Sequence, residues 1–343
     1  MRHGQEHPWR ESAVNAAETV IDAIRRVEFG PLTTFRNLGL LALSAAGERE
    51  ADYLTLGEAL ERHSARIVEI SEGGNVPELK FVNEGEQPVL LLDGEELLGA
   101  KQNRVINLTI LAPARQTCVI PVSCVEAGRW HHVSHDFVDA PRAHFAEGRA
   151  EKMRHVTSSL KADGSRSSDQ REVWSRIAEK SARLGAMSDT SAMSAMYDAN
   201  QVPLEEFVGA FTPIERQVGA VFFVNGRAAG LELFDASRTW RSLAPKLIRS
   251  YALDALDQEE GPVQSDASAD AAAFVERLMS SQASAFPAVG EGTDVRFEGA
   301  GALGAALVAS DRAIHVSAFP AGPAGARNRH KGRQPRRNGG PQI

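Results

Sequence analysis

The sequence has little cysteine and no long apolar run. Only two cysteines occur in 343 residues, Cys118 and Cys124. We predict that they lie on one strand, where about 20 Å would separate them at about 3.3 Å per residue, too far for a disulfide. No apolar stretch approaches the roughly 20 residues of a membrane span, and the charged N-terminus has no signal-peptide core. We therefore expect a soluble cytoplasmic protein with no membrane partner.

Outside the C-terminal tail, acidic residues outnumber basic ones. The net charge is −7, and residues 327–337 contain six Lys or Arg and no acid, which leaves −13 for the remainder. An acidic body argues against a general nucleic-acid-binding surface. The tail is rich in Gly, Pro and Asn and cannot bury enough apolar area to fold. We expect residues 321–343 to be a disordered basic tail and residues 1–12 to be flexible.

The spacing of apolar residues predicts an α+β fold with a largely antiparallel β core. Hydrophobic residues make up 43% of the chain, which is enough for a substantial core. Short strands separated by Gly, Asn and Pro are typical of antiparallel pairing. Residues 55–58 have the spacing of a helix capping box. The predicted early strands are 38–43, 66–70, 78–82 and 89–92, and we expect a single domain over 13–320.

The remaining elements include a helical insertion at about 145–200, with a break at 162–168. Asn225-Gly226 between two apolar runs predicts a β-hairpin. Apolar residues at helical spacing predict helices over 12–27 and 237–256, with a shorter C-terminal helix at about 271–281. Three strands follow, at about 295–297, 303–308 and 314–319.

Polar residues with chemical capability lie on strand faces between residues 90 and 130. Side chains two apart on a strand share a face. In the predicted strand 105–111, this rule places Arg104 on the same face as the apolar Ile106 and Ile110. In the predicted strand 118–125, it places Glu126 on the face of Cys124. A buried ion needs a partner, so we expect Arg104 and Glu126 to pair if the strands are neighbours, for a structural or a functional reason.

More polar groups surround these two runs than one ion pair requires, and such convergence at an apolar core is typical of a ligand pocket. Arg104, Arg129 and Lys101 could hold a phosphate or carboxylate, because guanidinium and ammonium groups bind these anions. Carboxylates suit general acid-base catalysis or a divalent cation. The other predicted participants are the carboxylates Glu126, Glu95 and Glu96, the thiol of Cys124 as a nucleophile or a small core residue, the amides of Gln102 and Asn103 to orient a ligand, and Trp130 on the pocket wall.

Four further motifs carry weaker signals. Residues 299–304 fit a dinucleotide-binding glycine pattern, but no helix or correctly spaced acid follows, so tight packing of small residues explains them better. Residues 158–161 have a Ser-x-x-Lys spacing without its companion motifs. Glu232 could join the polar site or face solvent. The histidine cluster forms either an ordinary polar loop or a source of ligands and protons, and it comprises His131, His132, His135 and Asp136.

Several long strings resemble one prokaryotic family, that of the ARG and Rhodanese-Phosphatase-superfamily-associated protein domain. The resemblance spans residues 30–256. It implies a setting in ADP-ribose or NAD-derived metabolism, and it assigns no activity or cofactor. The strings that carry it are 93–104 (DGEELLGAKQNR), 120–130 (IPVSCVEAGRW), 224–235 (VNGRAAGLELFD) and 250–253 (SYAL).

Two hypotheses from different classes remain open. In the first, the protein is an enzyme or ligand sensor that binds an anionic small molecule, such as a nucleotide or an ADP-ribose derivative, between residues 93–104 and 124–131. In the second, it is a noncatalytic interaction module, in which the polar cluster fixes strand register and the helical insertion and tail dock a protein partner. Substrate, metal and cofactor stay undetermined at this stage.

Overall fold

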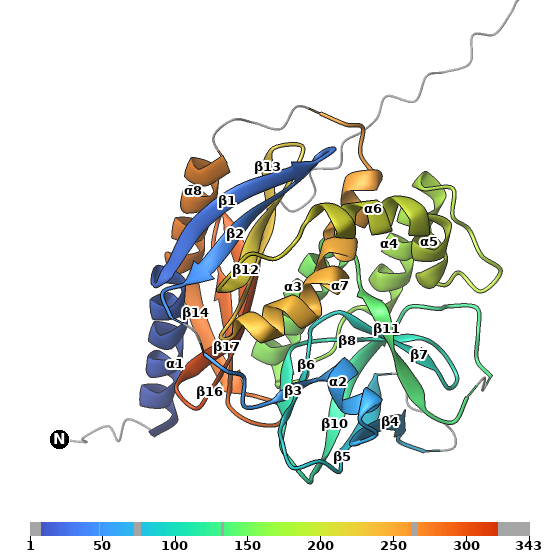
Figure 1. Ribbon diagram of the computed structural model, residues 1–343. Helices are drawn as coiled ribbons and strands as arrows, with labels where there is room; N and C mark the ends of the chain where they lie inside the picture. Colours follow the sequence, from blue (N-terminus) through green and yellow to red (C-terminus); the bar gives the residue numbers. More distant parts are fainter. Residues whose placement is uncertain (1–7, 48, 72–76, 132–133, 262–266, 322–343) are drawn as a thin grey trace, which may run out of the picture.

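The computed structural model describes residues 8–47, 49–71, 77–131, 134–261 and 267–321 (Figure 1). Residues 1–7 and residues 322–343 of the predicted tail lie outside this part of the chain. Within it, no helix combines the length and apolar character needed to cross a membrane. The helices are α1 (Pro8–Arg25), α2 (Leu56–Glu61), α3 (Ala146–Asp163), α4 (Gln170–Arg183), α5 (Ser194–Ala199), α6 (Gln201–Ala210), α7 (Ser237–Leu256) and α8 (Ala267–Met279).

The strands form three separate β units, and nearly all of their pairs are antiparallel. An eight-stranded sheet has the order β1-β2-β12-β13-β17-β16-β15-β14, a closed six-stranded barrel has the order β10-β5-β4-β11-β7-β8, and a small sheet has the order β3-β6-β9. The prediction of an α+β fold with a largely antiparallel core is therefore confirmed. The strands are β1 (Val27–Phe35), β2 (Leu38–Ala45), β3 (Leu54–Thr55), β4 (Ala65–Glu69), β5 (Glu78–Asn83), β6 (Val89–Leu91), β7 (Glu95–Gly99), β8 (Arg104–Ile106), β9 (Ile110–Ala112), β10 (Thr117–Cys124), β11 (Phe137–Ala143), β12 (Gln217–Val224), β13 (Arg227–Phe234), β14 (Gln282–Pro287), β15 (Thr293–Glu298), β16 (Ala302–Ala309) and β17 (Arg312–Pro320).

Helices cover both faces of the eight-stranded sheet. On the outer face, α1 and α8 pack on an apolar layer that includes Val221, Phe297 and Val316. On the inner face, α3 and α7 lie between the sheet and the barrel, as Figure 1 shows. Because strand side chains alternate, each face presents its own apolar set, and both sets are buried. The inner face therefore lies deep in the molecule.

The barrel has its own apolar core. Residues at alternate positions of its strands fill the interior, including Ile67, Phe81, Ile106 and Ile120. Side chains alternate between the inside and outside of a barrel strand, so two-residue spacing carries each inward row toward the barrel end. On β8 and β10 these rows end in Arg104 and Cys124, which face each other in register. The barrel mouth is thus lined by polar side chains.

Several local predictions are confirmed by the backbone and its hydrogen bonds. The Thr55 hydroxyl accepts from the Glu58 amide while the Glu58 carboxylate accepts from the Thr55 amide, a complete capping box. Asn225 and Gly226 both have positive φ in the turn between β12 and β13. The helical insertion is present as α3 to α5, with its break between residues 163 and 170.

The single predicted strand over 105–111 is wrong. The chain leaves the barrel after β8 and enters the small sheet as β9, with residues 107–109 between them. The reason is Pro121 on β10, which would face Asn107. The Asn107 amide donates to the Pro121 carbonyl at 3.0 Å, but proline has no N–H to complete the ladder. The break places Asn107 and Thr109 at the boundary between barrel and sheet.

The predicted packing role of the glycine-rich stretch 299–304 is confirmed. It forms the turn between β15 and β16 and the start of β16, not a strand-to-helix turn. A Cβ on Gly301 would lie 2.2 Å from the Arg277 side chain on α8, and one on Gly304 would lie 2.7 Å from Leu278. Small residues are needed here because α8 packs directly on this edge. The helix predicted to start near Ser12 begins at Pro8.

Candidate functional site

The predicted polar residues around Arg104 come together at the barrel mouth. We call Lys101, Gln102, Asn103, Arg104, Cys124, Glu126, Arg129 and Trp130 the mouth cluster. Three of its members follow β7, Arg104 begins β8, and four end or follow β10; the pairing of Arg104 with Cys124 brings these groups together. All of them are buried except Trp130, whose exposure is 48%. The prediction that Arg104 and Glu126 point away from solvent is confirmed.

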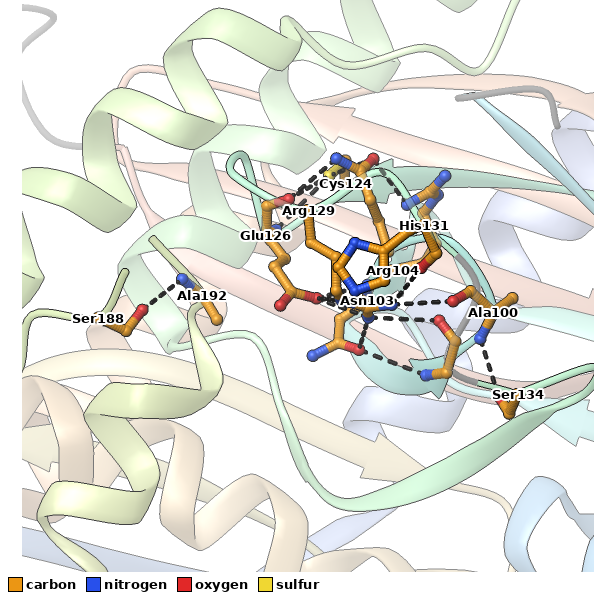
Figure 2. A network of polar contacts seen from close by, with 12 residues as sticks. Ala100, Asn103, Arg104, Cys124, Glu126, Arg129, His131, Ser134, Ser188 and Ala192 are labelled. Atoms are coloured by element: carbon orange, nitrogen blue, oxygen red, sulfur yellow. Dashed lines mark hydrogen bonds and ion pairs between the residues drawn. The ribbon is translucent and has the colours of Figure 1, made fainter. Parts of the chain in front are cut away.

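Arg129 joins the two loops of the mouth cluster (Figure 2). Its Nε donates to Glu126 Oε2 at 2.8 Å, and its Nη2 donates to Asn103 Oδ1 at 3.0 Å. Its Nη1 donates to the Ala100 carbonyl at 2.8 Å. The predicted Arg104–Glu126 ion pair is therefore wrong, because Arg129 turns back three residues along the chain and occupies the Glu126 carboxylate. Arg129 is committed to the protein and acts as a positioning residue.

Packing against the helical insertion fixes the Glu126 loop. The Gly128 amide donates to the Thr190 carbonyl at 2.8 Å, and the Met193 amide donates to the Val125 carbonyl at the same distance. A Cβ on Gly128 would lie 2.8 Å from the Thr190 Cα, so only glycine allows this approach. The insertion thus helps to shape the barrel mouth.

Gln102 connects Arg104 with Cys124. Its Oε1 accepts from Arg104 Nη1 and from the Cys124 thiol, each at 3.0 Å, while its Nε2 donates to the Glu126 carbonyl at 3.0 Å. These contacts use the oxygen and one N–H of the amide. Gln102 therefore holds the Arg104 side chain in one orientation and has little capacity left for a ligand.

Arg104 is a buried guanidinium without an ion pair among the described residues. Its exposure is 0%, and its Nε and Nη2 have no hydrogen-bond partner within the described part of the chain. The ring of Trp130 lies 5.8 Å from its Cζ and 5.5 Å from Lys101 Nζ, so the indole interacts with both cations. Burial lowers the pKa of Arg104, while nearby Cys124 and Glu69 oppose the shift. An arginine still stays charged in proteins, so this cation needs an anion.

Glu69, at the end of β4, is the residue of this site that sequence reasoning missed. Both of its carboxylate oxygens are buried and have no hydrogen-bond partner in the described structure. It lies two residues beyond Ile67, and Ile67 lies two beyond Ala65, so all three share the inward face of the barrel. This alternation in the sequence was the signal that could have predicted an inward-facing Glu69. Among the described residues, this end of the barrel therefore contains an acceptor and a donor that are both unsatisfied, and the charge of Glu69 acts on the pKa of Arg104.

The Cys124 thiol and the Glu126 carboxylate are the two groups of the mouth cluster that could act in catalysis, and the pKa of each is shifted away from the value that catalysis needs. Burial raises the pKa of the Cys124 thiol, so the nucleophilic thiolate is disfavoured. Burial also opposes ionisation of Glu126, but hydrogen bonds from Arg129 and the Asn103 amide outweigh it and lower its pKa. Glu126 is then ionised at neutral pH and a weak general acid. The arrangement suits binding better than acid-base or nucleophilic catalysis.

The structure does not bring Glu95 and Glu96 to the mouth cluster. Glu95 pairs with Lys246 of α7 at 2.7 Å, and Glu96 pairs with Arg142 of β11. Each acid of the Asp93-Gly94-Glu95-Glu96 string thus has its own basic partner from a different element. Asp93 and Glu95 link the barrel region to helices α3 and α7, and Glu96 links two strands of the barrel.

Asp93 and Glu232 belong to a second polar group, between the barrel and the inner face of the sheet. Arg149 of α3 binds Glu232 through both carboxylate oxygens, at 2.6 and 3.2 Å, and approaches Asp93 at 3.4 Å. Lys152 Nζ lies 2.7 Å from Asp93 Oδ1. Gly94 has a φ of +85° and lies against Arg149, where any Cβ would be 2.9 Å from its Cδ. We call Asp93, Arg149, Lys152, Glu232, Tyr251 and His315 the interface cluster.

No described group of three or more His, Cys, Asp or Glu side chains is placed to bind a metal ion. Of the predicted histidine cluster, His132 lies outside the described residues. His135 pairs with its neighbour Asp136 at 2.6 Å in an exposed loop. The His131 carbonyl, not its ring, accepts a bond from Arg129.

The family comparison matches residues 26–319, nearly the whole chain. The chain belongs to the family of the ARG and Rhodanese-Phosphatase-superfamily-associated Protein domain. The resemblance carried by the strings in residues 93–104, 120–130, 224–235 and 250–253 is thereby confirmed. No curated protein and no solved structure matches the chain.

Proposed function

We propose that the protein binds an anionic small molecule at the barrel mouth, with Arg104 as its anion contact. The observation that carries this proposal is the fully buried Arg104 guanidinium, two of whose nitrogens have no hydrogen-bond partner in the described part of the chain. An unpaired buried cation costs several kcal/mol, and a phosphate or carboxylate with two oxygens would satisfy both nitrogens. The mouths of β-barrels are common ligand sites.

Glu69 narrows the ligand further. Its unsatisfied carboxylate oxygens accept hydrogen bonds, so the ligand should carry hydroxyl or N–H donors as well as an anion. The half-exposed ring of Trp130 offers a flat apolar surface beside both cations. A nucleotide supplies all three complements, since it has a phosphate, ribose hydroxyls and a planar base. This favours nucleotides and ADP-ribose derivatives, in keeping with the setting that the family name suggests.

We assign the roles at the mouth by whether the polar atoms of each residue are already hydrogen-bonded within the protein. Arg104 and Glu69 would contact the ligand, and Trp130 would cover it. Gln102, Asn103, Glu126 and Arg129 would act as positioning residues, because their polar atoms are largely used inside the protein. Cys124, buried as a thiol, contributes a donor to Gln102. The proposal is therefore a binding protein or sensor at this site.

A thermal-shift titration of the full chain tests this. Pyrophosphate, AMP, ADP-ribose and NAD are the probes, applied to wild type, Arg104→Met and the matched control Arg66→Met. Arg66 is an exposed arginine on β4, three residues before Glu69. We expect at least one probe to raise the wild-type melting temperature by several degrees, because a ligand that binds only the native state stabilises it. Arg66→Met should respond equally, and Arg104→Met should not respond.

Glu69→Gln distinguishes the nucleotide from a simple anion. Removal of its acceptor charge should weaken ADP-ribose or AMP binding and leave pyrophosphate binding unchanged or stronger. The proposal is overturned if no probe shifts the wild-type transition, or if folded Arg104→Met responds like wild type. The first result would favour the noncatalytic interaction module, and the helical insertion would then be the surface to test for partners.

A further inference from the structure

A cleft lies at one end of the eight-stranded sheet, on the face that α1 and α8 cover. The strands β2 and β13 end there and β12 and β17 begin there, so the cleft borders four neighbouring strands. Its volume is about 380 Å³, which lies in the range of about 300–1,000 Å³ typical of small-molecule sites. No residue of the mouth cluster lines it.

The end of α1 forms one wall of the cleft. Thr19, Asp22 and Ala23 lie on one face of the helix, and Arg26, directly after the helix, continues that face. The wall thus presents two charged side chains. At Ala23 it has a small side chain, which leaves room between the helix and the sheet.

The floor of the cleft is apolar. Val218, Leu233 and Ala313 come from the adjacent strands β12, β13 and β17 and belong to the buried layer beneath α1. Removal of apolar surface from water is favourable, so this floor binds hydrocarbon groups better than polar groups. It therefore suits the apolar part of a ligand.

Most charges around the cleft are paired within the protein. Arg312 Nη1 donates to Asp235 at 3.0 Å, and its Nη2 donates to Asp52 at 2.8 Å. On the wall, an Asp22 carboxylate oxygen lies 3.8 Å from Arg26 Nη2. Each of these arginines has an aspartate beside it, so these residues select neither sign of charge in a ligand.

Two residues of the lining have no ion pair in the described part of the chain, and their charges are opposite. Arg49 lies between β2 and β3, three residues before Asp52. Asp311 lies beside Arg312 in the turn between β16 and β17, where its φ is +56°. Because Asp52 pairs with Arg312, the chain places Arg49 and Asp311 on the same side of the cleft. One cation and one anion there are left for a ligand.

We propose that this cleft binds a small zwitterion with an apolar side chain, the chemistry of an apolar α-amino acid, at a site separate from the barrel mouth. The described lining contains three arginines and three aspartates, so a ligand of one sign would meet as many like charges as opposite charges. A zwitterion gives its carboxylate to Arg49 and its ammonium to Asp311. Its hydrocarbon side chain lies on the floor formed by Val218, Leu233 and Ala313.

Isothermal titration calorimetry of the full chain tests this site, with free leucine, isoleucine, valine, methionine and phenylalanine as probes. We expect at least one to bind with a Kd below about 1 mM. Two analogues of the tightest probe, one without the ammonium and one without the carboxylate, separate its charged groups. For leucine these are 4-methylpentanoate and 3-methylbutylamine. Each analogue should bind at least about 10-fold more weakly, because each leaves one charge of the cleft without a partner.

Three variants locate the binding. Arg49→Met and Asp311→Asn each remove one charge and should weaken binding at least about 10-fold. Asparagine tolerates the positive φ at residue 311. Ala23→Leu should abolish binding, because leucine is a good helix former and its side chain fills the space between α1 and the floor.

Matched controls separate this site from general surface effects and from the barrel mouth. Arg66→Met removes an exposed arginine outside the cleft, Arg104→Met removes the proposed anion contact of the mouth, and both should bind the probe like wild type. The site is excluded if no probe binds wild type, or if folded Arg49→Met and Ala23→Leu bind like wild type. Equal affinity for 4-methylpentanoate and leucine would show an anion site instead of a zwitterion site. Loss of binding in Arg104→Met would place the amino acid at the mouth.

Discussion

The mouth cluster and the interface cluster bury charges in opposite ways. In the interface cluster, Glu232 accepts bonds from Arg149, Tyr251 and His315. In the mouth cluster, Arg104 has one bond to an uncharged amide, and Glu69 has none within the described residues. Both acids of the interface cluster thus have ion-pair partners inside the protein, whereas Arg104 and Glu69 of the barrel mouth have no ion pair among the described residues. Buried charge thus marks a binding site only where its hydrogen bonds are left open.

The difference has a physical origin in what surrounds each charge. The interface cluster is enclosed by a helix and a sheet, so a charge without a partner there would keep its full desolvation cost. The mouth cluster ends a barrel, and we propose that a ligand contacts the charges there. Charges without partners destabilise the ligand-free protein at such a site, and a ligand that pairs with them binds more tightly for that reason.

The largest effect should follow loss of Arg149. Arg149→Met leaves Glu232 and Asp93 without their shared cation, and we expect it to destabilise the protein by about 3–5 kcal/mol. Equilibrium urea unfolding measures this change. Arg176→Met, at an exposed site on the neighbouring helix α4, should change stability by less than about 1 kcal/mol. A small effect of Arg149→Met would mean that the two clusters do not differ as described.

The interface cluster should also control stability in acid. The pKa of Glu232 is lowered to about 2 from an ordinary value of 4.5, with burial opposed by Arg149 and His315. A lowered pKa in the folded state gives stability that is present above pH 4.5 and is lost as the pH falls toward 2, about 3 kcal/mol in all. Urea unfolding between pH 5.5 and 2.5 measures it. The loss over this range should be smaller in Glu232→Gln, and parallel curves would contradict the assignment.

The sequence predicts much of this framework because its signals are local. The capping box at Thr55, the hairpin at Asn225-Gly226 and the helix of residues 237–256 each depend on neighbours within a few positions. The alternation of side chains likewise indicated that Arg104 and Glu126 are buried. Short-range geometry decides these features, so one chain suffices to predict them.

The partners of buried charges are distant in the sequence, so the sequence alone does not predict which residues pair. Which acid faces Arg104 depends on the path of the loop after Cys124, which turns Arg129 back onto Glu126. The basic pair Arg149 and Lys152 is spaced three residues apart, which places both on one helical face, but nothing local says that this face is buried. The interface cluster joins residues up to 222 positions apart, and only the tertiary fold brings them together.

Loss of Arg104 should have the smallest effect on stability and separates the two clusters most clearly. Arg104→Met removes a buried cation that has no ion pair in the described structure, and the methionine chain fills a similar volume. We expect the free energy of unfolding to change by no more than about 1 kcal/mol, without ligand. Combined with Glu69→Gln, which removes the open carboxylate, the change should be neutral or stabilising, because both desolvation costs disappear. Urea unfolding beside Arg149→Met makes the comparison. A loss of 3–5 kcal/mol in Arg104→Met would show that Arg104 serves the fold, and the mouth would then be a structural cluster like the interface.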